Sequence, residues 1–294
     1  MIVTTAPTGT IGSQLLERLL ESTDEPVRVV VRDPGKLRPD IHERAEVVPG
    51  SHGDPAVVDS ALTGADALFW ITPPPWAAPT LRAGMEDFAG PAVAAVARHG
   101  VGHVVTISNL GRGVPGDAGV VTHNLAVDDL FAATGAACRA LTLPGLMDNL
   151  RRDAVPIVDD GRFSSALDAD LKVPWVAATD VAAVASGLLL DRTWTGQASR
   201  PVLGPEDLST HDAALVLSDL LGRTVQHVHL GIAELRRALL ARGASPAMAD
   251  GMVAMMVAKN AGLDNHEVRT PETSSSTTLR TWAERNLVPV RSHR

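Results

Sequence analysis

The sequence predicts an α/β protein with a doubly wound parallel sheet and a smaller C-terminal α/β lobe. Short apolar runs alternate with amphipathic helix patterns as far as residue 143, and a glycine-rich turn joins the first run to the first helix. Beyond Pro144 the alternation becomes less regular. A length of 294 residues suits one domain with a dependent lobe better than two independent domains. We therefore expect a sheet domain over 1–150 and a smaller lobe over 151–294, with segments that return to the sheet.

Six apolar runs are predicted as the strands of the sheet. They cover residues 2–4, 27–31, 46–48, 67–71, 103–107 and 138–143. The run over 27–31 is continuous and β-branched apart from Arg28, which is typical of a parallel strand buried on both faces.

The segments between these runs show helical spacing of apolar residues. Asp54 and Pro55 are the expected cap and first residue of one helix. Gly90-Pro91 is expected to kink or break the helix that begins near Leu81. A later helix is expected to end at Gly135.

The second half predicts three more helices, strands near Val202 and over 225–230, and a last helix over 279–286. The three helices cover about 209–221, 232–242 and 246–259. The Ser/Thr-rich stretch 270–278 is expected to be an exposed connection.

Composition excludes several functional classes. The net charge is −8 and no basic block occurs, which argues against nucleic acid as a partner. No stretch is long and apolar enough for a membrane span, and a strand at Ile2 leaves no room for a signal peptide, so we expect a cytoplasmic protein. A monomer or a homodimer is expected. The single Cys138 excludes an internal disulfide. His227 and His229 share a strand face, but no third ligand is evident nearby, so no metal site is predicted.

The segment IVTTAPTGTIGSQLLERLL carries the strongest functional signal. Gly9 allows the backbone to approach a pyrophosphate, and Gly12 allows the helix to pack closely on the strand, as in Rossmann-type nucleotide sites. The N-terminus of the helix offers free N–H groups and a positive dipole to phosphate. Ala6 replaces the first motif glycine, and Pro7 removes one backbone donor. We expect a dinucleotide over residues 2–20; a tight turn without a ligand is the alternative.

The cofactor preference is read from the end of the second strand. Arg32 stands twenty residues after Gly12, where an acid favours NAD and an arginine accommodates the 2′-phosphate of NADP. Lys36 adds a second cation, whereas the carboxylate of Asp33 would oppose the phosphate. We expect NADP(H) as the preferred cofactor, with NAD(H) as the alternative; simple solvation of both cations is the competing interpretation.

Six segments in order, PTGTIG, VRVVVRDPGKL, ADALFWITPPP, VGHVVTISNLG, VDDLFAATGAACRALTLPGLMDN and GPEDLS, resemble the NmrA-like family of atypical short-chain dehydrogenases. This family of NAD(P)-binding proteins includes quinone and imine reductases and redox-sensing regulators. The resemblance implies cofactor contacts from Thr5, Ala6, Thr8, Gly9, Thr10, Ile11, Gly12, Arg32, Lys36, Ile71, Thr72, Pro73, Ser108, Asn109, Pro144 and Gly145. Ser51 stands where the family often has an adenine-binding Asp.

The chain contains no tyrosine, so the usual Tyr–Lys proton relay of short-chain dehydrogenases is excluded. Asn109 and Asn124 could polarise an acceptor oxygen, and His123 could donate a proton. The alternative is that Thr122 or Asn124 caps the helix that contains Val127.

An apolar acceptor pocket is expected from large flexible and aromatic side chains. The candidates are Trp76, Met85, Met147, Trp175, Met252 and Met256, with Met248 and Met255 on the same methionine-rich helix. Core packing is the competing role for that helix. The leading hypothesis is a reductase that passes hydride to a small hydrophobic acceptor of quinone-like, conjugated or aromatic type. An NADP(H)-sensing regulatory protein and a non-redox biosynthetic enzyme remain the alternatives.

Overall fold

The computed structural model describes residues 1–289, which divide into two compact units. Unit 1 comprises 1–109, 122–142 and 181–200. Unit 2 comprises 110–121, 143–180 and the described residues from 201 onward. Each unit is therefore assembled from separate segments of the chain. None of the helices over residues 1–289 combines the length and apolarity needed to cross a bilayer.

Unit 1 is built on a seven-stranded sheet with strand order β10-β6-β5-β4-β1-β2-β3. The strands are β1 (Ile2–Thr5), β2 (Val27–Val31), β3 (Glu46–Pro49), β4 (Ala67–Trp70), β5 (His103–Asn109), β6 (Ala137–Leu143) and β10 (Gln197–Pro201). Strand β1 pairs in parallel with β2 and β4, β2 with β3, and β4 with β5. The six strands predicted from the apolar runs are confirmed, with small shifts at their ends.

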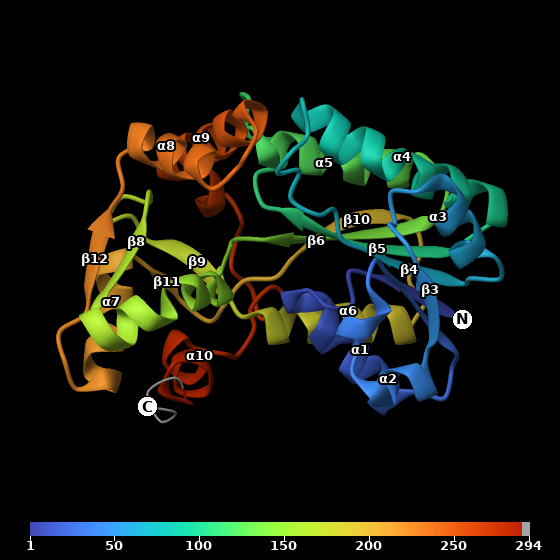
Figure 1. The fold of residues 1–294 in the computed structure, drawn as a ribbon, viewed down its shortest axis with the longest axis horizontal. Helices are drawn as coiled ribbons and strands as arrows, with labels where there is room; N and C mark the ends of the chain where they lie inside the picture. Colours follow the sequence, from blue (N-terminus) through green and yellow to red (C-terminus); the bar gives the residue numbers. More distant parts are fainter. Residues whose placement is uncertain (290–294) are drawn as a thin grey trace. The chain divides into compact units, whose positions relative to one another are not determined.

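Helices cover both faces of this sheet (Figure 1). One face carries α3 (Pro55–Leu62), α4 (Leu81–His99) and α5 (Val120–Ala132), and the other α1 (Thr10–Ser22), α2 (Pro39–Arg44) and α6 (Ala178–Leu190). The apolar faces of strands and helices meet in two layers, where Leu15, Leu16 and Phe69 are fully buried. This is the doubly wound arrangement that the sequence predicts.

Two of the boundary predictions concern α3 and α4. Asp54 caps α3 as expected, because its side chain accepts from the N–H groups of Ala56 and Val57. Of the kink or break expected at Gly90-Pro91, the break is wrong, since α4 continues through Pro91 to His99. Burial of Ala89, Ala92 and other apolar residues along the helix compensates for the hydrogen bond that Pro91 cannot make.

The start and end of α5 also differ from the prediction. The helix begins at Val120, so Thr122 and Asn124 lie inside it and the capping interpretation is wrong. The chain turns before α5 instead, where Asp117 accepts from the N–H of Gly119 at 2.8 Å. The helix ends at Ala132 rather than at Gly135, which has a φ of +86° in the turn to β6.

Unit 2 contains a three-stranded sheet, β11-β9-β7, and a two-stranded sheet, β12-β8. Its strands are β7 (Gly145–Leu146), β8 (Arg162–Ser165), β9 (Val173–Val176), β11 (Asp207–Leu208) and β12 (Gln226–His229). Its helices are α7 (Thr210–Leu221), α8 (Ile232–Ala241), α9 (Pro246–Asn260) and α10 (Leu279–Asn286). These helices and β12 confirm the elements predicted for the second half. Short 3₁₀ and π turns cover Met147–Asp153, Pro156–Asp160 and Leu263–Asn265.

The packing of unit 2 separates two sides of its sheets. Helices α7 and α10 pack on one side over a buried core that includes Phe163, Leu217 and Trp282, and the α8–α9 hairpin lies on the other side (Figure 1). The stretch 270–278, predicted to be exposed, is mostly half-buried and is hydrogen-bonded to the chain at Leu203. Leu203 donates to the carbonyl of Thr273 and accepts from the N–H of Ser275, each at 2.7 Å.

Candidate functional site

The glycine turn of unit 1 leaves the N-terminus of α1 uncovered. Ala6 has a φ of +52°, and its carbonyl accepts from the N–H of Gly9 at 3.0 Å. A Cβ at Gly12 would lie 2.9 Å from the carbonyl carbon of Ala6 and would overlap its oxygen. Gly9 is the N-cap, with no side-chain cap and no acid in the first turn. The free N–H groups of this turn fit a dinucleotide diphosphate.

The ends of β1 and β4 are joined beside this turn. The Thr5 hydroxyl donates to the carbonyl of Phe69 at 3.1 Å and accepts from the N–H of Ile71 at 3.0 Å. The Thr72 hydroxyl accepts from the indole N–H of Trp70 at 2.9 Å. Because carboxyl ends of parallel strands share one sheet edge, this network fixes predicted cofactor residues at the edge where nucleotides bind.

The predicted adenosine end carries two exposed cations, Arg32 and Lys36. Asp33 is occupied within its own turn, where its side chain accepts from the N–H of Gly35 at 3.1 Å. The Nζ of Lys36 lies 4.0 Å from Asp33 Oδ2. The hydroxyl of Ser51 accepts from the N–H of Gly53 at 3.2 Å. Arg32 thus faces no carboxylate partner among residues 1–289 in the ion pairs of the structure.

His52, which sequence reasoning missed, anchors the Ser51 loop to β4. Its ring lies edge-on to Trp70 and Phe88, with centroids 5.0 Å away in each case, and its Nε2 bonds the carbonyl of Ile71 at 3.1 Å. Burial is the main reason that the pKa of His52 falls to about 4, and Arg32 lowers it further. The ring is therefore neutral at pH 7 and donates to Ile71 from Nε2.

The three predicted catalytic residues lie in unit 1, on β5 and α5. Asn124 donates from Nδ2 to Asn109 Oδ1 at 2.8 Å. His123 Nδ1 lies 2.7 Å from Glu86 Oε1, and the side chain of Glu86 is only 17% exposed. A carboxylate on Nδ1 fixes the orientation of the imidazole and leaves Nε2 for a reacting group. Glu86 was missed because it lies 37 positions before His123, on α4.

Ser108, the other predicted residue at the end of β5, is buried and donates its hydroxyl to Asp128. The second oxygen of Asp128 accepts from Thr106 at 2.6 Å. Asp128 thus forms a buried polar centre with two hydroxyl groups of β5. The hydroxyl hydrogen of Ser108 is therefore already used in a hydrogen bond to Asp128.

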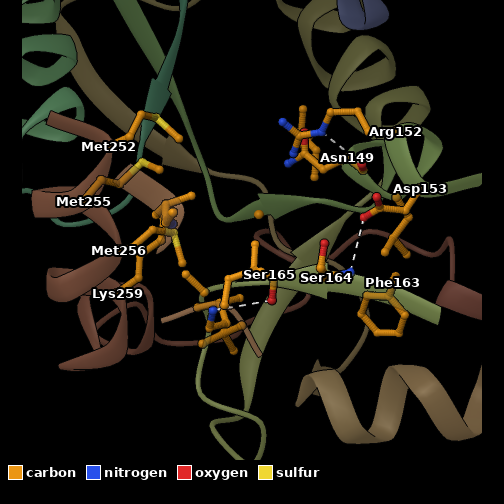
Figure 2. A pocket seen from close by; sticks show the side chains of 18 of the residues that line it. Asn149, Arg152, Asp153, Phe163, Ser164, Ser165, Met252, Met255, Met256 and Lys259 are labelled. Atoms are coloured by element: carbon orange, nitrogen blue, oxygen red, sulfur yellow. Dashed lines mark hydrogen bonds between the residues drawn. The ribbon is translucent and has the colours of Figure 1, made fainter. Parts of the chain in front are cut away.

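Unit 2 contains a cavity of about 370 Å³ on the α8–α9 side of its sheets (Figure 2). Met252, Met255, Met256 and Lys259 line it from α9, and Phe163, Ser164 and Ser165 line it from β8, although the ring of Phe163 points away from it into the core of unit 2. Other lining residues include Gly145, Asn149, Trp175, Leu239 and Asp264. Apolar side chains thus surround a few polar groups, the usual composition of a small-molecule site.

The predicted substrate residues separate into three groups. Trp175, Met252 and Met256 line this cavity, as does Met255. Met147 is fully buried in the core of unit 2, and Met248 is buried without lining the cavity. Trp76 and Met85 belong to unit 1, the first 42% exposed and the second buried. Of the predicted cofactor residues beyond β6, Pro144 and Gly145 belong to unit 2.

His227 and His229 lie on β12, where His227 is held by two hydrogen bonds. The two nitrogens of His227 bond the hydroxyls of Ser165 and Thr210, each at 2.9 Å. Over residues 1–289 no group of three or more His, Cys, Asp or Glu side chains is placed to hold a metal ion.

Comparisons with known proteins agree on the cofactor-binding family. A model of an NAD(P)H-binding family matches residues 7–191. The chain is 30% identical to the NAD(P)H azoreductase of Xenophilus azovorans, over 86% of this chain and 85% of that one. The NADPH-dependent quinone oxidoreductase of Escherichia coli, solved with NADPH, has a TM-score of 0.79 at 21% identity, over 97% and 99% of the two chains. NmrA, a negative transcriptional regulator solved with NADP, has a TM-score of 0.74 at 16% identity, over 99% and 96%.

Proposed function

The chain belongs to an NAD(P)H-binding family, and from this premise we propose that it is an NmrA-like atypical short-chain dehydrogenase that passes hydride from NADPH to a hydrophobic aromatic or conjugated acceptor. The chain binds NAD(P)H and is an NAD(P)H-dependent reductase. The azoreductase relative supports acceptors of this chemical class. The observation that carries the proposal is the glycine turn, where a Cβ at Gly12 has no room and no side chain caps the first turn of α1.

NADPH is the proposed cofactor in preference to NADH. Arg32 follows β2 directly and is exposed, so its guanidinium is free to bind the 2′-phosphate. The turn formed by Asp33 draws that carboxylate towards Gly35, which reduces its repulsion of a phosphate. Lys36, next to Asp33, contributes a second positive charge at the same turn.

The proposed proton source is His123. Bound NADPH supplies a hydride, which adds two electrons and one hydrogen to the acceptor and leaves a negative charge on it. The protonated imidazole of His123 then gives its Nε2 proton to that charge, while Glu86 keeps the ring oriented through Nδ1. The amide groups of Asn109 and Asn124 position the acceptor oxygen or nitrogen.

The proposed acceptor surface is the cavity of unit 2. Methionine side chains adapt to irregular aromatic ligands, and Trp175 offers a flat apolar wall. Acceptors such as quinones and azo compounds stabilise incoming charge by conjugation. A single proton donor is therefore sufficient for them, and the missing tyrosine is consistent with this class.

Stopped-flow measurement of NADPH oxidation with 1,4-naphthoquinone and with an azobenzene dye tests the proposal. We expect turnover with at least one acceptor, and a loss of at least tenfold in kcat for His123→Gln. His99→Gln is the matched control, because His99 Nε2 also pairs with a carboxylate, Asp59 Oδ1, at 2.8 Å. Glu86→Gln is expected to alter the pH profile of kcat. Tight NADPH binding without turnover of any acceptor would instead favour the sensor alternative.

A further inference from the structure

A buried ion pair forms part of the cavity wall in unit 2. Lys259 lies in the last turn of α9, and Asp264 lies on the 3₁₀ turn that follows. Lys259 Nζ donates to Asp264 Oδ2 at 2.5 Å, and the two side chains are 8% and 2% exposed. Both residues line the cavity. The pair is thus nearly removed from solvent yet adjoins a space large enough for a ligand.

The stability of the fold does not explain why the cavity wall contains the Lys259–Asp264 ion pair. Burying two ions costs several kcal/mol each, and an apolar pair of similar volume is often as stable or more stable. The neighbouring cavity residues on α9 are Met252, Met255 and Met256, so an apolar wall would continue the surface already present. A role in ligand recognition explains why a charged pair stands there.

The hydrogen bonding of the pair is incomplete. Asp264 Oδ1 is buried and has no hydrogen-bond partner among the described residues. Lys259 Nζ carries three N–H groups, and the structure gives it one acceptor within residues 1–289, Asp264 Oδ2. Leaving a buried charged group partly unsatisfied is costly, so a ligand that completes both sets of bonds gains affinity.

We propose that this pair recognises a hydroxyl group on an aromatic ligand. Such a hydroxyl donates its proton to Asp264 Oδ1 and accepts a hydrogen bond from Lys259 Nζ. A carboxylate is repelled by Asp264, an ammonium group is repelled by Lys259, and an ether cannot donate. The ring then packs against the methionines of α9 and Trp175. This inference rests on the proposed function for placing the acceptor in the cavity, and it names that acceptor as a hydroxylated aromatic compound.

Calorimetric titration of the full chain with three naphthalene derivatives tests the proposal without any hydride transfer. The ligands are 2-naphthol, a neutral phenol at pH 7; 2-methoxynaphthalene, which cannot donate; and 2-naphthoate, an anion. We expect 2-naphthol to bind at least tenfold more tightly than either of the others. Equal affinities, or no binding of 2-naphthol up to its solubility limit, would overturn the proposal.

A double variant assigns the preference to the ion pair. In Lys259→Met/Asp264→Val we expect 2-naphthol and 2-methoxynaphthalene to bind within twofold of each other. The matched control is Arg236→Met/Asp250→Val, which removes an exposed ion pair between α8 and α9 that does not line the cavity. It should keep the preference. A preference retained in the first variant would contradict the assignment, and thermal unfolding checks that both variants fold.

The outcomes separate this inference from the proposed reductase activity. Selective binding of 2-naphthol without NADPH oxidation supports the hydroxyl site and counts against hydride transfer. NADPH oxidation with equal affinities for naphthol and its methyl ether supports hydride transfer and removes the hydroxyl site. A hydroxylated azobenzene reduced with lower KM than azobenzene agrees with both.

Discussion

Replacing Gly12 by alanine tests the structural basis of nucleotide binding in unit 1. The added Cβ would lie 2.9 Å from the carbonyl carbon of Ala6, closer than real Cβ atoms approach backbone, and would overlap the carbonyl oxygen. Neither atom is the end of a flexible side chain. The start of α1 must therefore move away from the turn, or the peptide after Ala6 must rotate.

The expected size follows from two opposing contributions. Overpacking against rigid atoms costs about 1–3 kcal/mol, and the backbone contact places this case near the upper end. Alanine recovers about 1 kcal/mol because glycine is a poor helix former. We expect Gly12→Ala to lower the free energy of unfolding by about 2 kcal/mol. Displacing the N–H groups of the first turn should weaken NADPH binding at least tenfold.

Urea unfolding and calorimetric titration with NADPH measure the two effects. Gly187→Ala is the matched control, because Gly187 lies within α6, is exposed, and would carry a Cβ with nothing within 4 Å. We expect this control to bind NADPH normally and to be stabilised by about 1 kcal/mol. If Gly12→Ala matched it in stability and affinity, the close approach of Ala6 and Gly12 would not matter and the reasoning would fail.

Three other changes give measurable outcomes in unit 1. Ala6→Gly relieves a φ of +52° and should stabilise the chain by about 0.5–1 kcal/mol in urea unfolding, after the entropy of glycine is subtracted. Arg32→Glu should weaken NADPH binding at least tenfold and leave NADH binding unchanged or improved, whereas Arg98→Glu at the end of α4 should change neither cofactor's affinity beyond twofold. The folded pKa of His52 is about 4 against 6.5 in the unfolded chain, so its stabilising effect is complete above pH 6.5 and declines as pH falls towards 4. Between pH 7 and 5 the loss should be about 2 kcal/mol, and His52→Leu should remove that part of the pH dependence of urea unfolding.

Within the seven-stranded sheet, the sequence predicted the six apolar strands closely and placed the polar strand β10 only approximately, near Val202. The first six strands of the sheet are recognisable because burial on both faces demands continuous apolar runs, as in Val27–Val31. Strand β10 stands at the edge of the sheet, and four of its five residues are exposed. An edge strand needs no apolar pattern, so the bounds of Gln197–Pro201 could not be predicted, and the sequence indicated a strand only near Val202, just after its end.

In the candidate site, features set by neighbouring residues could be predicted from the sequence, whereas contacts and burial that arise only in the fold could not. The glycine turn was predictable because its constraint is local, lying within seven residues between Ala6 and Gly12. The partner of His123 was not, because α4 and α5 come together only in the fold and Glu86 has no distinguishing neighbours in sequence. Lys259 and Asp264 lie only five positions apart, but charged residues after a helix are usually exposed. Their burial appears only in the structure.

The polar groups at the end of β5 explain why a conjugated acceptor suits this chain better than a simple carbonyl. The hydroxyl of Ser108 is already given to buried Asp128. Asn109 and Asn124 bond each other through one amide oxygen and one amide nitrogen, and neither residue type exchanges protons. Histidine is the one residue type among the three predicted catalytic residues that exchanges a proton near neutral pH. Reduction of an isolated carbonyl places the full charge on one oxygen while the hydride arrives, so it needs a donor aligned at that atom. A quinone or azo group delocalises the charge first, and His123 then needs only to be within reach when the proton is delivered.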